Sequence, residues 1–245
     1  MIEFLQLTVY GVVLGSVIAL GAIGLSLVYA ILRFPHFAHG DYLTVGAFLA
    51  LGVVQGLGTS ALVALPVGIA GTAAVAVGID QILYRRLRRV APVILLIASV
   101  GVALILRSAI QIIWGSSNQV YAAGITMPYD VAGVNIARDH LLILAGAIAL
   151  MVALHLFLQK TKMGKAMRAM SDNADLAQVT GIRVNTVIIW TWIIGGALAG
   201  AAGVFLGMDT RVHPVMGWRV LLPIFSAAIL GGIGRPYGAV LGGLI

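Results

Sequence analysis

Residues 160–185 read KTKMGKAMRAMSDNADLAQVTGIRVN and form the longest polar segment of the chain, with near-continuous apolar runs on both sides. Small and apolar residues recur in it at steps of four and three, a spacing that places them on one face of a helix. They are Met163, Met167, Met170, Ala174, Ala177 and Gly181. The charged residues fall elsewhere, so the segment predicts an amphipathic helix outside the apolar runs.

The ends of this helix are also predicted by its residues. Asp172, with Asp175 three residues later, can cap a short helix, and Gly181 can end it in a left-handed turn. The segment is then either a solvated connector whose apolar stripe rests on the bilayer surface, or a docking helix for a soluble partner. We favour the docking helix.

The composition determines the class of protein. Of the 245 residues, 61% are hydrophobic and 9% charged, with a mean hydropathy of +1.07, whereas soluble domains have roughly 25% charged residues. Long apolar runs without strand alternation predict an all-α, polytopic helical protein of the lipid bilayer. The absence of cysteine excludes disulfides and thiol catalysis. The net charge of +7 is attributed to cytoplasmic loops rather than to nucleic-acid binding.

Seven apolar runs follow one another within what we expect to be a single transmembrane domain, residues 1–245. They are 4–32, 42–58, 60–84, 92–114, 140–158, 186–208 and a last run from near Val220. The last run is interrupted by GGIGRPYG at 231–238, so we expect seven to eight transmembrane helices. A span that begins near Tyr237 has only about nine residues, against the roughly 20 needed, and we therefore expect the natural chain to continue.

Basic residues predict the orientation. Residues 85–89 contain four arginines and residues 160–183 contain five basic residues, whereas the 115–139 connector has only Arg138. Because positive charge concentrates in cytoplasmic loops, we expect the first two segments in the cytoplasm and the connectors 115–139 and 209–219 outside. The N-terminus is then also outside if each of the first three runs spans once.

Residues 33–41, RFPHFAHGD, predict a break between the first two runs. Pro35 removes a backbone donor and Gly40 permits unusual dihedrals. The break is either a cytoplasmic loop in water or lies at membrane depth, where freed backbone groups must line a cavity. Transporters bind substrate at such discontinuous helices. The candidate substrate-pathway residues are His36, Phe37, His39, Gly40 and Asp41.

Small residues in the sixth run form two ladders with four-residue spacing. They are Gly195, Ala199, Gly203 and Gly207 in one ladder, and Gly196 and Gly200 in the other. Such ladders allow close helix contact, here either within the chain or with a second subunit.

Charged residues are scarce inside the apolar runs. Arg107 is the deepest, and we expect it to snorkel or to pair at the outer side rather than to bind substrate. Asp41 and Asp80 both lie near the ends of runs. A secondary transporter needs buried carboxylates for ion coupling, so this distribution argues against one.

Several segments of the chain resemble those of a known family of permeases. DLAQVTG at 175–181 resembles the EAA---G loop of ABC-importer permeases, with Asp for Glu and Leu for the first Ala. GLSLVY at 24–29 with FAHGD at 37–41 is similar to the branched-chain amino acid permeases of the high-affinity hydrophobic amino acid importer family. Later segments of that family are matched by GKAMRA at 164–169 and AILGGIG at 228–234, so the resemblance covers roughly residues 5–245. The chain departs from the family at Pro35-His36, where Ile-Asn is usual.

The resemblance implies a permease subunit of an ATP-driven importer in a bacterial-type inner membrane. Its implied partners are a second permease subunit, two cytoplasmic ATPase subunits and an extracytoplasmic substrate-binding protein. The chain itself has no G-x-x-x-x-G-K-[ST], H-E-x-x-H or G-x-S-x-G motif. We therefore expect no enzyme activity, no metal and no bound cofactor in this chain, with ATP hydrolysed on the partners. The residues expected to contact an ATPase are Met167, Met170, Asp172, Ala174, Asp175, Ala177 and Gly181.

The sequence leaves the substrate open. Branched-chain or related small neutral amino acids are the first hypothesis. Urea or short amides are the alternative, as is a secondary transporter or channel that is not coupled to ATP. Transport into vesicles with and without ATP separates these classes.

Overall fold

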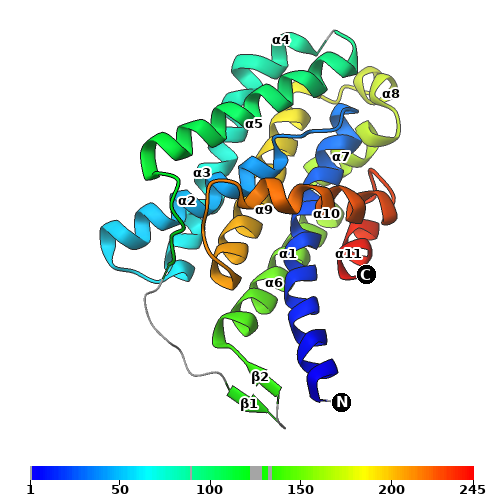
Figure 1. Ribbon diagram of the computed structural model, residues 1–245. Helices are drawn as coiled ribbons and strands as arrows, with labels where there is room; N and C mark the ends of the chain where they lie inside the picture. Colours follow the sequence, from blue (N-terminus) through cyan, green and yellow to red (C-terminus); the bar gives the residue numbers. More distant parts are fainter. Residues whose placement is uncertain (1, 89, 122–128, 132–133) are drawn as a thin grey trace.

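The computed structural model describes residues 2–88, 90–121, 129–131 and 134–245, and it consists largely of helices (Figure 1). The helices are α1 (Ile2–Leu32), α2 (His39–Leu57), α3 (Ala61–Ile79), the π-helix η1 (Asp80–Tyr84), α4 (Arg85–Leu87), α5 (Pro92–Trp114), α6 (Arg138–Lys160), α7 (Lys162–Asp172), α8 (Ala174–Val179), α9 (Val184–Asp209), α10 (Met216–Leu230) and α11 (Pro236–Leu244). Strands β1 (Tyr129–Val131) and β2 (Val134–Ile136) form a short antiparallel pair, which the sequence did not predict.

Six helices in the described part of the chain are long and apolar enough to cross a membrane. They are α1, α2, the continuous helix Ala61–Leu87, α5, α6 and α9. The chain is therefore a polytopic helical membrane protein, as predicted. Two further apolar helices, α10 with 15 residues and α11 with nine, are shorter than the roughly 20 residues that a span requires. Six of the expected seven to eight spans are therefore seen in the described residues.

Helix α9 lies at the centre of the bundle, where it packs against α1, α2 and α3. Its glycines face the backbones of these neighbours: a Cβ on Gly203 would collide with the Leu43 carbonyl oxygen, and one on Gly200 would lie 2.6 Å from that of Gly68. The rest of the two ladders is buried in the same way. The ladders therefore make helix contacts within this chain, which was one of the two alternatives; the other was contact with a second subunit.

The break between α1 and α2 lies inside the bundle. The chain turns back at Arg33, and α2 begins at His39, whose Nε2 donates to the Gly21 carbonyl oxygen of α1 (2.9 Å). Gly21 precedes the end of α1 at Leu32 by about 16 Å of helix axis, at 1.5 Å per residue. That is roughly half the hydrocarbon thickness of a bilayer. Residues 33–38 thus form a re-entrant segment, not a loop in water.

Helix α10 begins beside the start of α2. Figure 1 shows α10 running across α1 rather than along it, and its first turn meets the first turn of α2 at Gly217 and Gly40. A Cβ on Gly40 would lie 2.5 Å from the Gly217 carbonyl oxygen. The Gly217 amide also donates to Thr44 Oγ1 (3.1 Å). Two helices therefore start next to each other in the interior.

Contacts between loops show which segments share an end of the bundle. At one end, Arg88 Nη1 donates to Asn185 Oδ1 (3.0 Å), which joins the two basic segments. At the other end, Gln119 and Val212 exchange backbone hydrogen bonds, and Gln6 bonds to the backbone of Asn135. The basic segments thus lie opposite the N-terminus and the 115–121 connector, as the charge count predicted. Arg89 and residues 122–128 and 132–133 lie outside the described residues.

Candidate substrate pathway and partner-docking segment

His36 lies at the centre of a buried aromatic cluster, which we define as Phe34, His36, His39, Tyr42, Tyr84 and Trp192. Its Nε2 shares a hydrogen bond with Tyr84 Oη (3.0 Å). Its ring centroid lies 5.0 Å from that of Trp192 and 5.1 Å from that of Tyr42. The cluster joins the re-entrant segment to α2, η1 and α9, so it fixes the shape of the break from inside the bundle.

The aromatic cluster is polar as well as aromatic. Within the described chain, four of its buried atoms have no hydrogen-bond partner: His36 Nδ1, His39 Nδ1, Tyr42 Oη and Trp192 Nε1. An unsatisfied buried polar group costs about 1–3 kcal/mol, and lipid offers no partner. The bundle therefore holds a costly polar centre at the depth of the break.

Asp41, two residues into α2, faces the opposite side of the break. Its carboxylate is fully buried and accepts two hydrogen bonds from Arg107 of α5, from Nε to Oδ1 and from Nη2 to Oδ2, both 3.1 Å. The Arg107 guanidinium carbon also lies 4.9 Å from the centre of the Trp218 ring of α10. Arg107 is paired, as predicted, but its partner is a pathway candidate inside the bundle. It does not snorkel to the outer side.

Phe37 lies on the same side as Asp41. Its amide donates to Ser99 Oγ of α5 (3.0 Å), and its ring lies 5.3 Å from that of Phe225 of α10. Next to these rings is an apolar cavity of about 320 Å³, lined by Leu25, Tyr29, Pro35, Phe37, Phe225 and Ile229 among others. Small-molecule pockets begin at about this size.

The five candidate pathway residues therefore separate into two groups. His36 and His39 point into the aromatic cluster, whereas Phe37 and Asp41 contact α5 and α10, and Gly40 packs on Gly217. Sequence reasoning missed Trp218. Arg107 and Trp218 are 111 positions apart in the sequence, and no sequence pattern predicts that they make contact.

The segment after α6 consists of two helices, not one. Asn173 has extended dihedrals (φ −154°, ψ 106°), ends α7 and caps α8 by accepting a hydrogen bond from the Leu176 amide (3.0 Å). The predicted cap, Asp172, is instead the last residue of α7. Asn and Asp cap helices about equally well, so the extended backbone at Asn173, and not the type of side chain, distinguishes it from Asp172.

The predicted left-handed turn at Gly181 is confirmed. Its φ is +90°. The Ile182 amide donates to the Ala177 carbonyl, and the Gly181 amide donates to that of Gln178, both at 3.0 Å. These two hydrogen bonds are the helix-ending pattern that favours glycine at the turn. The chain is thereby sent from α8 into α9.

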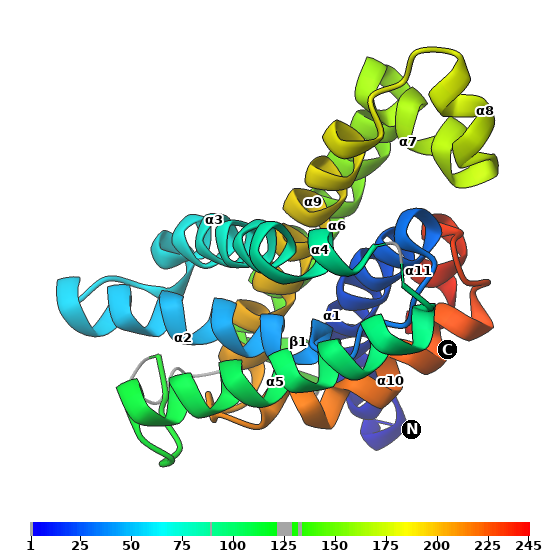
Figure 2. The ribbon, with the colours of Figure 1, turned by 90° about the horizontal axis from the view of Figure 1, so that it is seen from above.

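Three of the residues expected to contact an ATPase are instead buried within this chain. Met167, Met170 and Ala177 have exposed fractions of 2%, 3% and 4% within this chain. The apolar stripe of α7 packs on α1, α6 and α9 of the same chain. The exposed residues of α8 are Ala174, Asp175, Leu176, Gln178 and Val179, which we call the outer face of α8. Figure 2 shows α7 and α8 standing out from the other helices.

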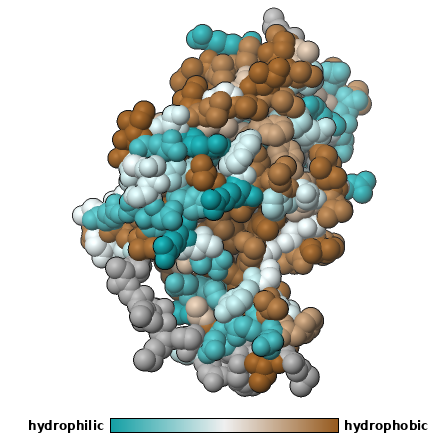
Figure 3. Space-filling model, viewed as in Figure 1, coloured by the Kyte–Doolittle hydropathy of each residue, from teal (hydrophilic) through white to brown (hydrophobic). Residues whose placement is uncertain are grey.

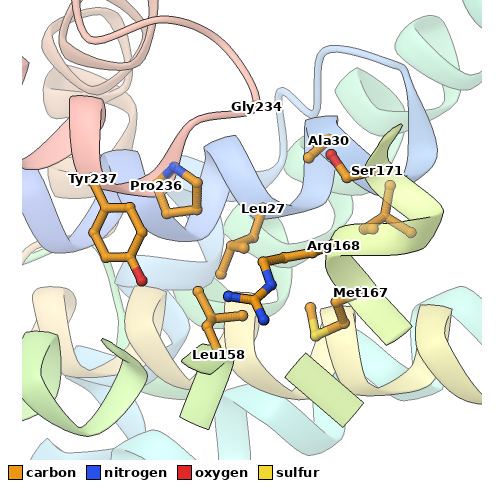
Figure 4. A pocket seen from close by; sticks show the side chains of 10 residues that line it. Leu27, Ala30, Leu158, Met167, Arg168, Ser171, Gly234, Pro236 and Tyr237 are labelled. Atoms are coloured by element: carbon orange, nitrogen blue, oxygen red, sulfur yellow. The ribbon is translucent and has the colours of Figure 1, made fainter. Parts of the chain in front are cut away.

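Side chains of α6, α7 and α11 make contact where α7 packs on the bundle (Figure 4). The Arg168 side chain reaches between Leu158 and Met167 and donates to Gln159 Oε1 (2.6 Å). Gln159 in turn donates to Tyr237 Oη (3.2 Å). The cavity between these side chains is about 70 Å³, which is too small for an amino acid. We therefore interpret this region as a structural contact.

Comparison with known proteins identifies the family. The family described as "Branched-chain amino acid transport system / permease component" matches residues 7–245. The high-affinity branched-chain amino acid transport system permease protein BraD of Pseudomonas aeruginosa is 33% identical over 99% of this chain and 84% of its own length. The corresponding protein LivH of Escherichia coli K12 is 32% identical over 99% and 83%. The probable LivH of Methanocaldococcus jannaschii is 33% identical over 96% and 76%.

No solved structure matches the chain. The match over residues 7–245 nevertheless includes both the re-entrant segment and α8, and it extends along all six membrane-spanning helices. The chain therefore belongs to the family of branched-chain amino acid transport system permease components.

Proposed function

We propose that this chain is a membrane-spanning subunit of an ATP-driven importer that carries branched-chain or related small neutral amino acids across a bacterial-type inner membrane. The observation that supports this most is the identity of 32–33% to three permeases over nearly the whole chain. Six membrane-spanning helices and a re-entrant segment at mid-depth fit a transport role.

The outer face of α8 is the proposed contact for a cytoplasmic ATPase subunit. Leu176 and Val179 are 64% and 85% exposed, at the end of the bundle that carries the basic segments. A short helix with apolar anchors suits insertion into a groove, while neighbouring charges such as Asp175 tune the register. Two such ATPases, a second permease subunit and an extracytoplasmic binding protein complete the proposed assembly.

The substrate pathway is proposed to follow the side of the break that faces α5 and α10. Phe37, Gly40 and Asp41 lie there, with an apolar cavity beside Phe37. His36 and His39 support the re-entrant segment from behind through the aromatic cluster.

Reconstitution of the complete complex in proteoliposomes tests this function. Leucine uptake is expected only when the binding protein is supplied outside and ATP is present on the ATPase side. Uptake that proceeds equally with ADP, or that follows a proton gradient, would show a secondary transporter or channel and contradict the proposal.

A further inference from the structure

We propose that Arg107 binds the α-carboxylate of the transported amino acid at mid-depth, with Asp41 and Trp218 as the residues that position its guanidinium. The inference rests on the proposed import of amino acids, and it names a group of this chain that contacts the substrate. Arg107 then has a role beyond pairing with a neighbouring carboxylate.

The first observation is the geometry of the Asp41–Arg107 pair. Asp41 is fully buried and receives two parallel hydrogen bonds of 3.1 Å, whereas the Arg107 side chain remains 17% exposed. A bidentate pair fixes the plane of the guanidinium. A buried carboxylate thus holds one edge of a cation that is still accessible from the surface.

The second observation is what remains free on Arg107. A guanidinium has five N–H donors, and Asp41 accepts two of them. Within the described chain, Nη1 donates no hydrogen bond, while one face of the group lies against Trp218, which is 42% exposed. A planar cation fixed on one edge and one face has its remaining edge available, and a carboxylate is the anion that matches this fork.

The third observation is the position of the pair. Asp41 lies in the first turn of α2, next to Gly217, and follows His39, which bonds to Gly21 about 16 Å before the end of α1. Gln111, one turn after Arg107, and Arg219, next to Trp218, are also exposed. Figure 3, viewed as Figure 1 with α5 and α10 towards the reader, shows hydrophilic residues gathered near the middle of this surface, beside hydrophobic ones. Charges at this depth face a water-filled cavity or other protein, not lipid.

The surroundings match the rest of an aliphatic amino acid. Phe225 follows Trp218 by seven residues, about 10 Å along α10, and contacts Phe37 beside the apolar cavity of about 320 Å³. The pathway therefore offers a site for a charged end at Arg107 and, further along the same helix, an apolar wall for a side chain. The polar residues among the described lining of that cavity are Ser26 and Tyr29. Neither carries a positive charge, so a carboxylate pairs better with Arg107.

The test compares variants in the complete complex with its ATPases and binding protein, using leucine as the probe. Arg107→Lys keeps the charge but removes the fork, because an ammonium is a point charge. A lost hydrogen bond to a charged group predicts that ATP-dependent leucine uptake falls about tenfold or more. Assembly of each variant complex is measured alongside its uptake. Arg85→Lys is the matched control, since among the described residues the Arg85 side chain donates to Gln81 of its own helical segment and to no other. It should leave assembly and uptake as in the wild type.

The double variant D41R/R107D separates binding from architecture. It restores an ion pair of opposite direction, so a purely structural pair predicts recovery of uptake. Our proposal predicts that uptake stays at least about tenfold down, because an aspartate then faces the substrate carboxylate. Wild-type uptake by Arg107→Lys or by the double variant would overturn the inference. If the double variant does not assemble, wild-type uptake by Arg107→Lys is by itself enough to overturn it. Failure of the wild-type complex to show ATP-dependent uptake would instead overturn the proposed function.

Discussion

Arg33 is the one described non-glycine residue with a positive φ (57°), and it stands where α1 gives way to the re-entrant segment. The left-handed region costs a residue with a Cβ about 1–2 kcal/mol. The Arg33 guanidinium donates through Nη2 to the Ser171 carbonyl oxygen in the last turn of α7. One strained residue therefore connects the segment before α8 to the break that begins the proposed pathway.

Two substitutions of Arg33 separate the effect of its strained backbone from that of its hydrogen bond to Ser171. Arg33→Gly removes both the strain and the hydrogen bond, whereas Arg33→Ala removes only the hydrogen bond. We expect Arg33→Ala to be less stable than Arg33→Gly by about 1 kcal/mol, measured by thermal unfolding in detergent. Both variants should weaken substrate-stimulated ATP hydrolysis. Ser171→Ala keeps the carbonyl acceptor and serves as the control; equal stability of the Ala and Gly variants would contradict this account.

Gly40 gives a second prediction at this scale. The sequence pointed to it for unusual dihedrals, but it lies in α2 without a positive φ, and its real constraint is the Gly217 backbone at its side. Gly40→Val should therefore push α2 from α10 and abolish leucine uptake. Gly56→Ala, in the same helix with nothing near its Cβ position, should be neutral or stabilise by about 0.5–1 kcal/mol. Normal uptake by Gly40→Val would count against the α2–α10 contact.

At the scale of elements, α7 and α8 show how far periodicity reaches. The spacing of apolar residues correctly predicted helix and an amphipathic stripe, and Gly181 correctly marked its end. It did not reveal the break at Asn173 or which surface covers the stripe. Periodicity finds the apolar face of a helix, but the partner of that face depends on residues far away in the sequence, here on α1, α6 and α9.

The two faces of α8 predict opposite outcomes for one added charge. Val179→Asp places a carboxylate on the exposed outer face, so folding should be unchanged while co-purification of ATPase subunits falls, because loss of an interface anchor costs more than about 1 kcal/mol. Ala177→Asp buries an unpaired carboxylate, which should destabilise the permease itself by several kcal/mol. Thermal unfolding measures the stability of each variant, and pull-down measures how much ATPase subunit it binds. A Val179→Asp variant that retains full ATPase binding would exclude the outer face of α8 as the contact.

At the scale of the whole molecule, composition and charge predicted a polytopic helical protein and the grouping of its loops. They could not predict the depth at which α2 and α10 begin. That depth is fixed by His39 bonding to Gly21 and by Gly40 meeting Gly217, contacts between residues that hydropathy treats independently. The Asp41–Arg107 pair was missed for the same reason: each charge was seen alone, near the end or within an apolar run.

The orientation itself is open to a direct measurement. Ser117 and Gln178 are exposed. Ser117 belongs to the connector that pairs with Val212, and Gln178 to α8 at the end with the basic segments. In intact cells, a membrane-impermeant thiol reagent should label Ser117→Cys and leave Gln178→Cys unlabelled, because basic segments stay in the cytoplasm. Both should react after permeabilisation. The reverse pattern in intact cells would invert the assigned topology.

The meeting of Gly40 and Gly217 has a mechanical consequence. Most helix contacts are made by side chains, which absorb small displacements by changing rotamer. Here backbone touches backbone, and backbone atoms within helices have no alternative rotamers to adopt. A movement of α10 towards α2 at this point must therefore displace α2, because neither backbone can yield by changing rotamer.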